Sequence, residues 1–254
     1  MDNLKDLRDA IIIVGKSIQN EDLFPTIIKE ASNLIISNPY AFTIGVCLDR
    51  GTKAEIIWTI PYDIKEDLGH LDPNKIYQFS LSEFEDLFYR LHRHPRYIND
   101  APRTIQELTQ IVVEECGGNA SNIWNGKHAA EVNRTFQSIH GDGPGIANMG
   151  VLLIEALYGV CFDDLDRKRM DIKPDVHTKR VLYRLGVSEA ETEEAALVAA
   201  RIMNPNYPGE LDGGLWWIGR NWCYASHPDC EHCPMKDNCI YRVRKKIFRK
   251  NVNV

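Results

Sequence analysis

Four of the chain's seven cysteines lie close together near its C-terminus, in the spacing Cys223-x6-Cys230-x2-Cys233-x5-Cys239. Four thiols in so short a segment constrain the chain to wrap around one compact object, because thiolates bind zinc or iron–sulfur clusters in preference to hard cations. Zinc sites built from four cysteines usually combine two close Cys-x2-Cys pairs, whereas this segment has one pair and two outlying cysteines. The segment therefore predicts a metal centre, with zinc and an iron–sulfur cluster both open.

Helical periodicity dominates the rest of the chain, and we find no convincing strand alternation. The fold class predicted from this pattern is all-α. One of the helices is expected to begin at Ser80, since Ser80 and Glu83 form a capping-box pattern, and another to end at Gly117-Gly118. The longer predicted helices cover residues 4–18, 25–36, 80–92, 101–116, 127–138, 146–160, 175–186 and 188–203.

The length of 254 residues suits one large domain or two closely packed small ones. No apolar run approaches the roughly 20 residues that cross a bilayer, so we expect no membrane association. The N-terminus is charged and lacks the apolar core of a secretory signal, which predicts a cytoplasmic protein.

The net charge of −6 is unevenly distributed. Residues 240–254 contain no acid and six basic residues, namely Arg242, Arg244, Lys245, Lys246, Arg249 and Lys250. Because 30 − 6 leaves 24 basic residues against 36 acidic ones, the remainder of the chain has a balance of −12. The basic tail is either a solvated end or a phosphate-binding segment, since charge attraction acts over a Debye length of about 8 Å.

Two further motifs lie between the helices. Residues 139–148 read Ile-His-Gly-Asp-Gly-Pro-Gly-Ile-Ala-Asn, a glycine-rich turn that enters a helix. Such a turn presents backbone N–H groups at the positive end of the helix dipole and can bind phosphate, although it is also an ordinary tight connection. Further along, Asp175 precedes a predicted helix and has His177 two residues later, a pattern that a simple N-cap explains equally well.

Taken together and in this order, the three motifs resemble the helix-hairpin-helix DNA glycosylases of the endonuclease III superfamily. The cysteine spacing resembles the family's cluster loop, with Gly219-Arg220 upstream at the family's spacing. The resemblance covers roughly residues 34–240. The matching positions in the hairpin and around the aspartate are Gly141, Gly143, Ala147, Asn148, Asp175, His177, Arg180 and Val181.

The resemblance implies two helical lobes with the helix-hairpin-helix motif at their junction: a six-helix barrel lobe of residues 34–155 and an iron–sulfur cluster lobe of residues 1–33 and 156–254. It also implies a [4Fe–4S] cluster on the four cysteines and Asp175 as the catalytic carboxylate. The expected partner is double-stranded DNA that contains a damaged or mismatched base, bound by a monomer. The expected DNA-binding residues are Gly141, Gly143, Gly145, Ala147, His177, Arg242 and Lys245.

The chain departs from the family at two positions. Gly145 stands where bifunctional members carry the lysine that attacks the sugar, and Gly51 stands where many members have a glutamine that fills the space left by the extruded nucleotide. Arg50 is an alternative plugging residue. We therefore expect a monofunctional DNA glycosylase. Two alternatives stay open: a glycosylase/lyase that uses an out-of-place lysine such as Lys173, and a non-catalytic DNA-binding protein in which Asp175 is only a cap.

The gap between Gly145 and Asp175 is also longer than the family's usual spacing. This difference implies an insertion around residues 162–173, which we expect to form a charged loop. Lys173 and Lys179 lie near Asp175 in sequence, but neither occupies the position of the family's lysine.

Overall fold

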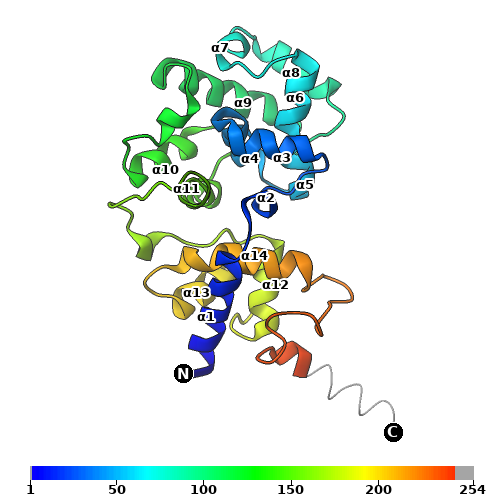
Figure 1. Ribbon diagram of the computed structural model, residues 1–254, viewed down its shortest axis with the longest axis vertical. Helices are drawn as coiled ribbons and strands as arrows, with labels where there is room; N and C mark the ends of the chain where they lie inside the picture. The colour runs from blue at the N-terminus through cyan, green and yellow to red at the C-terminus, as the bar shows by residue number, and fades with distance from the viewer. Residues whose placement is uncertain (1, 244–254) are drawn as a thin grey trace. The chain divides into compact units, whose positions relative to one another are not determined.

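The computed structural model describes residues 2–243, and within that range the chain forms helices and turns with no β-strand (Figure 1). The predicted all-α class is confirmed. The chain divides into two compact units. We call Gln19–Leu165 the central unit, and Met1–Ile18 with Asp166–Val254 the terminal unit.

The central unit is built around helix α4, in which every residue from Tyr40 to Leu48 is buried. The Phe42 ring packs edge-on against Trp124 and Tyr158, with centroids 5.9 and 5.4 Å apart. Aromatic pairs of this kind contribute about 0.5–1.5 kcal/mol beyond the area that they bury. The elements of this unit are α2 (Asn20–Leu23), α3 (Lys29–Ser37), α4 (Pro39–Leu48), α5 (Ala54–Ile57), α6 (Ile60–Leu68), α7 (Pro73–Ile76), α8 (Leu81–Arg90), α9 (Ala101–Gln110), the π-helical η1 (Ile111–Glu115), the 3-10 helix η2 (Ala120–Ile123), α10 (Ala129–Ser138) and α11 (Pro144–Tyr158).

The boundaries of the central unit differ from the predicted lobe of residues 34–155. At the N-terminal side, the Phe24 ring packs against Phe42 and Trp58 with centroids 5.9 and 4.8 Å apart. At the other end, the backbone N–H of Ala129 donates to Asp164 Oδ1 over 3.0 Å. These contacts attach residues 19–33 and 156–165 to the central unit.

The terminal unit combines the first helix with the last third of the chain. Its elements are α1 (Asp2–Lys16), the 3-10 helix η3 (Arg167–Arg169), α12 (Val176–Leu185), α13 (Glu193–Met203), the 3-10 helix η4 (Pro208–Leu211) and α14 (Asp212–Asn221). Helix α14 lies against both α1 and α12 (Figure 1). The close crossing with α1 needs a residue without a side chain, because a Cβ at Gly214 would overlap the Ile11 carbonyl. Ile11, Leu182 and Leu215 are fully buried around this crossing.

Within the described residues, no single helix is long and apolar enough to cross a membrane, and the one helix pair that meets the length and composition test together, α3 with α4, is bent by 109°.

Two hydrogen bonds from backbone N–H groups to carboxylates hold the start of α10, the first helix of the hairpin. Backbone hydrogen bonds, from Ala129 to Asp164 and from His128 to Glu131, lower the pKa of these carboxyls from their usual 3.8 and 4.5. A folded pKa below the unfolded one stabilises the fold above the unfolded pKa, and this contribution disappears as pH falls through the folded value. We therefore expect the free energy of unfolding to drop modestly below about pH 4.

Urea unfolding at pH 3 and pH 6 measures this effect. Asp164→Asn keeps a hydrogen-bond acceptor but no longer titrates, so its unfolding free energy should change less between the two pH values than that of the wild type. An equal change in both proteins would contradict the role of Asp164.

Candidate functional site

The glycine-rich turn joins α10 to α11 in the central unit, as predicted for a helix-hairpin-helix. Gly141 has φ +83°, a left-handed conformation that favours glycine. Gly143 is the N-cap of α11 and Pro144 its first residue, so the first N–H groups of this helix have no intrahelical acceptor. This is the arrangement that binds a phosphate oxygen at a helix N-terminus.

Gly145 lies in the first turn of α11 and faces open space. A Cβ there would meet no atom within 4 Å, and its backbone is not left-handed. Packing therefore does not require glycine at this position, and a lysine would fit. Ala147, by contrast, is completely buried, so its side chain belongs to the core and only its backbone is a candidate for DNA contact.

Arg50 is held against the hairpin. A Cβ at Gly141 would overlap its guanidinium group. Arg50 Nη2 donates to Thr104 Oγ1 over 2.9 Å, and Thr104 Oγ1 donates to the His140 carbonyl over 2.8 Å. The guanidinium also lies over the Tyr97 ring, 5.6 Å from its centroid. These contacts tie Arg50 to the turn, whereas its suggested role as a plug stays a prediction.

Gly51, the other candidate at the plug position, has φ +69°. A Cβ at Gly51 would stand 3.1 Å from the side chains of both Arg96 and Tyr97. The left-handed backbone and this crowding both favour glycine, so the departure from the family's glutamine has a local structural cause.

Asp142, between the two glycines of the turn, is a residue that sequence reasoning missed. It is only 7% exposed. Burial and the neighbouring Asp142 carboxyl, which accepts a hydrogen bond from the thiol, raise the pKa of Cys47, and the nearby Arg50 opposes this shift. The hairpin thus has a buried carboxyl beneath its exposed backbone, close to a cation. An acid between two glycines was the only sequence signal for it.

Replacing Gly141 by alanine should destabilise the central unit, because the substitution adds a left-handed penalty of about 1–2 kcal/mol and a clash with Arg50. Urea unfolding of Gly141→Ala, Arg50→Ala and the double variant separates the two contributions. The alanine at position 141 should cost less in the Arg50→Ala background. An equal cost in both backgrounds would show that Arg50 does not occupy the space beside the turn.

Asp175 is the N-cap of α12 in the terminal unit. Its Oδ1 accepts hydrogen bonds from the backbone N–H groups of His177 and Thr178, both over 2.8 Å. The backbone just before Asp175 is held in place as well. The Lys173 N–H donates to Asp212 Oδ1 over 2.6 Å, and Thr178 Oγ1 donates to the Lys173 carbonyl over 2.9 Å. Both described bonds to the Asp175 carboxylate fall on Oδ1, so Oδ2 is available for a water or a substrate.

His177 and Arg180 connect the start of α12 to the cysteine segment. Arg180 is 7% exposed, and its Nη2 lies 3.0 Å from His177 Nδ1 and donates to the Gly219 carbonyl over 3.0 Å. Its Nε donates to the Cys223 carbonyl over 2.6 Å. The His177 side chain packs so closely on α14 that a Cβ at Gly219 would overlap it. Its predicted DNA contact stays a prediction.

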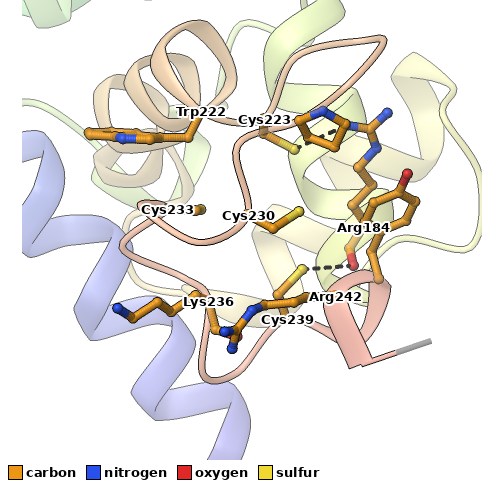
Figure 2. A pocket seen from close by; sticks show the side chains of 10 residues that line it. Arg184, Trp222, Cys223, Cys230, Cys233, Lys236, Cys239 and Arg242 are labelled. Carbon is orange, nitrogen blue, oxygen red and sulfur yellow. Dashed lines mark hydrogen bonds between the residues drawn. The ribbon is translucent and has the colours of Figure 1, made fainter. Parts of the chain in front are cut away.

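The four cysteines line one pocket of the terminal unit (Figure 2). Three basic residues, Arg184, Lys236 and Arg242, line it too, and among residues 2–243 no acidic residue does. The other lining residues are Trp222, Pro228 and Tyr241. Arg184 Nη1 donates to Cys223 Sγ over 3.5 Å, and Cys239 Sγ donates to the Arg184 carbonyl over 3.6 Å. In the described part of the chain, no three His, Cys, Asp or Glu side chains are arranged around a single metal ion.

The donor set of this pocket fits an anionic thiolate centre. Burial, with a smaller contribution from the three neighbouring cysteines, raises the pKa of Cys233 to about 11, although a hydrogen bond with the Met235 backbone opposes the shift. Thiolates in such a place need compensating positive charge, which metal ions and the basic lining supply. In a [4Fe–4S] cluster each cysteine binds a different iron, so the ligands do not converge on one point. The residues present therefore fit the cluster that the family resemblance implies.

Of the two DNA-binding residues predicted after Cys239, only Arg242 lies within the described residues. Arg242 forms ion pairs with Glu231 and Asp237, over 2.8 and 3.7 Å, and donates to the Lys236 carbonyl. Arg242 thus helps to shape the cysteine segment, and its DNA contact stays a prediction. Lys245 lies outside the described residues. Asp175, His177 and the cysteines belong to the terminal unit, whereas Arg50, Gly51 and the hairpin glycines belong to the central unit.

The sequence of this chain is similar to those of known proteins. No family model matches the sequence. The chain is 26% identical to an endonuclease III of Thermotoga maritima over 164 residues, which are 64% of this chain and 67% of that protein. It is 24% identical to an adenine DNA glycosylase of Rattus norvegicus over 223 residues, 84% of this chain. That second match spans 37% of the rat protein's length.

Solved structures share the fold at 18% sequence identity. A trapped endonuclease III–DNA covalent intermediate has a TM-score of 0.64, and a thermostable thymine-DNA glycosylase has one of 0.62. In each case the match covers 96% of this chain and 98% of the other. The sequence matches and the shared fold support a resemblance of this chain to the endonuclease III-like superfamily.

Proposed function

We propose that the protein is a base-excision DNA glycosylase that extrudes a damaged or mispaired base from duplex DNA and hydrolyses its N-glycosidic bond. The observation that carries this proposal is the Asp175 carboxylate, which stands at the start of α12 with both backbone hydrogen bonds on Oδ1. The names of the relatives support the same activity: endonuclease III and adenine DNA glycosylase.

Breaking the bond between base and sugar builds positive charge on the sugar. An ionised carboxylate beside that charge stabilises the transition state and can accept a proton from the attacking water. Two backbone N–H groups hold the Asp175 carboxylate through Oδ1, which would leave Oδ2 for the reaction. Extrusion of the base costs a few kcal/mol, and this cost is smallest for damaged or mispaired bases, which contributes to selectivity.

The hairpin and the cysteine pocket would have binding and structural roles. The free N–H groups at the start of α11 would bind a backbone phosphate near the extruded nucleotide. The pocket cysteines would hold a [4Fe–4S] cluster, which when bound would cross-link the segment from Cys223 to Cys239. Arg180 and Arg184 of α12 donate hydrogen bonds to backbone carbonyls at the start of that segment. Cross-linking of the segment would therefore also stabilise the helix that Asp175 caps.

The enzyme is monofunctional in this proposal, because Gly145 offers no nucleophile although a lysine would fit there. Without an amine that attacks the sugar, no Schiff base forms and the strand stays intact at the abasic site.

Borohydride trapping tests this part of the proposal. Wild type incubated with its lesion duplex and borohydride should give no covalent protein–DNA adduct, while hot alkali should still reveal the abasic product. An adduct in the wild type would instead indicate a lyase. Its loss in Lys173→Gln but not in Lys179→Gln would then identify Lys173 as the nucleophile.

A further inference from the structure

The predicted insertion before Asp175 contains three consecutive basic residues in an otherwise acidic chain. Arg167, Lys168 and Arg169 form the 3-10 helix η3 at the start of the second part of the terminal unit. Lys168 and Arg169 are exposed, and neither has an acidic partner among residues 2–243. A solvated charge run explains such a sequence equally well, so the surrounding structure decides between the two.

The segment is held in place on both sides of these cations. The Arg167 guanidinium lies 4.8 Å from the centre of the Tyr207 ring. The Gly209 N–H donates to the Met170 carbonyl over 2.7 Å, which attaches the end of η3 to η4. Because a flexible charged loop would not make such contacts, Lys168 and Arg169 project from an ordered backbone.

Four acids, Asp163, Asp164, Asp166 and Asp171, flank the three cations in the sequence, and no described ion pair joins any of them to Lys168 or Arg169. The one nearby acid after η3, Asp171, is neutralised by a bidentate pair with Arg201, at 2.8 and 2.6 Å. Arg201 thus removes the negative charge that would otherwise oppose an anionic ligand. Phosphates of a nucleic acid are the anions that a pair of adjacent exposed cations near a glycosylase site would meet.

The distance to the candidate catalytic residue is short. Asp175 is six positions after Arg169, and an extended chain of that length spans at most about 20 Å. Since one strand of DNA rises about 3.4 Å per nucleotide, this reach corresponds to about six nucleotides.

We propose that Lys168 and Arg169 form a second phosphate-binding site, separate from the hairpin, that contacts the duplex within about six nucleotides of the extruded base. The inference rests on the proposed glycosylase function, because it places DNA at Asp175. Because the insertion of residues 162–173 contains four acidic and four basic residues, the site depends on the placement of Lys168 and Arg169 and not on the net charge of the segment.

The test is the salt dependence of binding to an undamaged duplex. Dissociation constants of the wild-type protein and of the Lys168→Gln/Arg169→Gln variant are measured between about 50 and 200 mM salt. The slope of log affinity against log salt should become shallower by about two, one for each phosphate contact removed. Lys5→Gln, which removes an exposed lysine on α1 of the same unit, is the matched control and should keep the wild-type slope.

An unchanged slope in the double variant, with an unchanged melting temperature, would overturn the inference and leave a solvated charge run. A shallower slope in a protein that excises no base from any duplex would keep the phosphate site and reject the glycosylase proposal. The two failures are therefore distinguishable.

Discussion

Replacing Asp175 by asparagine should strongly reduce base excision while leaving the protein folded. Asparagine is as good an N-cap as aspartate, and its side-chain oxygen can accept the same two N–H bonds that Oδ1 accepts from His177 and Thr178. What the substitution removes is the negative charge. Loss of a positioned charge or base at the reacting centre reduces the rate by about 10²–10⁴-fold.

Two measurements separate catalysis from capping. The melting temperature of Asp175→Asn should match that of the wild type, whereas Asp175→Ala should lose both activity and about 1 kcal/mol of stability. Asp72→Asn is a matched control, because Asp72 caps α7 by the same type of hydrogen bond, to the Asn74 N–H over 3.0 Å. Full activity in Asp175→Asn would show that the residue only caps α12.

The second large effect is expected at Cys233. We expect the purified protein to carry one [4Fe–4S] cluster per chain, and Cys233→Ser to lose its iron and sulfide. Cys233 packs against the core of the terminal unit, and its pocket brings four partly buried thiols together. Loss of the cluster should therefore also lower the melting temperature and expose the segment from Cys223 to Cys239 to proteolysis.

Metal and sulfide analysis with absorption spectroscopy measures this prediction. Cys161→Ser is the control, since Cys161 is exposed, lies in the central unit and does not line the pocket. It should keep both the cluster and the stability of the wild type. One zinc per chain without sulfide would contradict the cluster and return the four cysteines to a zinc site.

Much of the fold was predictable because its signals are local. The capping box at Ser80 is present, with the Ser80 N–H donating to Glu83 Oε2 over 2.7 Å, and α8 begins at Leu81 as expected. The helix after Asp175 begins at Val176, one residue after the predicted start, and α11 begins at Pro144, two residues before the predicted start at 146. Each of these signals depends on residues only a few positions apart.

The predicted lobe boundaries and the hairpin network depend on contacts that periodicity does not encode. Phe24 joins the central unit through packing on Phe42 and Trp58, residues remote in sequence. The contact of Arg50 with the turn at Gly141 is equally long-range. A sequence pattern indicates which face of a helix is apolar but not which distant side chain it meets.

The site shows the same division between local and long-range signals. Asp175 and the four cysteines were predicted from short motifs, and the structure shows that the cysteines line a common pocket. The bonds from Arg180 to Gly219 and Cys223, which join the aspartate's helix to that pocket, span about forty residues and left no spacing signal.

The most direct test of the central claim is a cleavage panel. Duplexes that each contain one lesion (uracil, hypoxanthine, alkylated adenine, oxidised pyrimidine, 8-oxoguanine or mispaired thymine) are incubated with wild type and with Asp175→Asn, and each reaction is analysed with and without hot alkali. We predict that at least one duplex yields a product only after alkali, and that Asp175→Asn does not form it. Strand cleavage without alkali would contradict a monofunctional enzyme, and intact strands in every duplex would contradict a glycosylase.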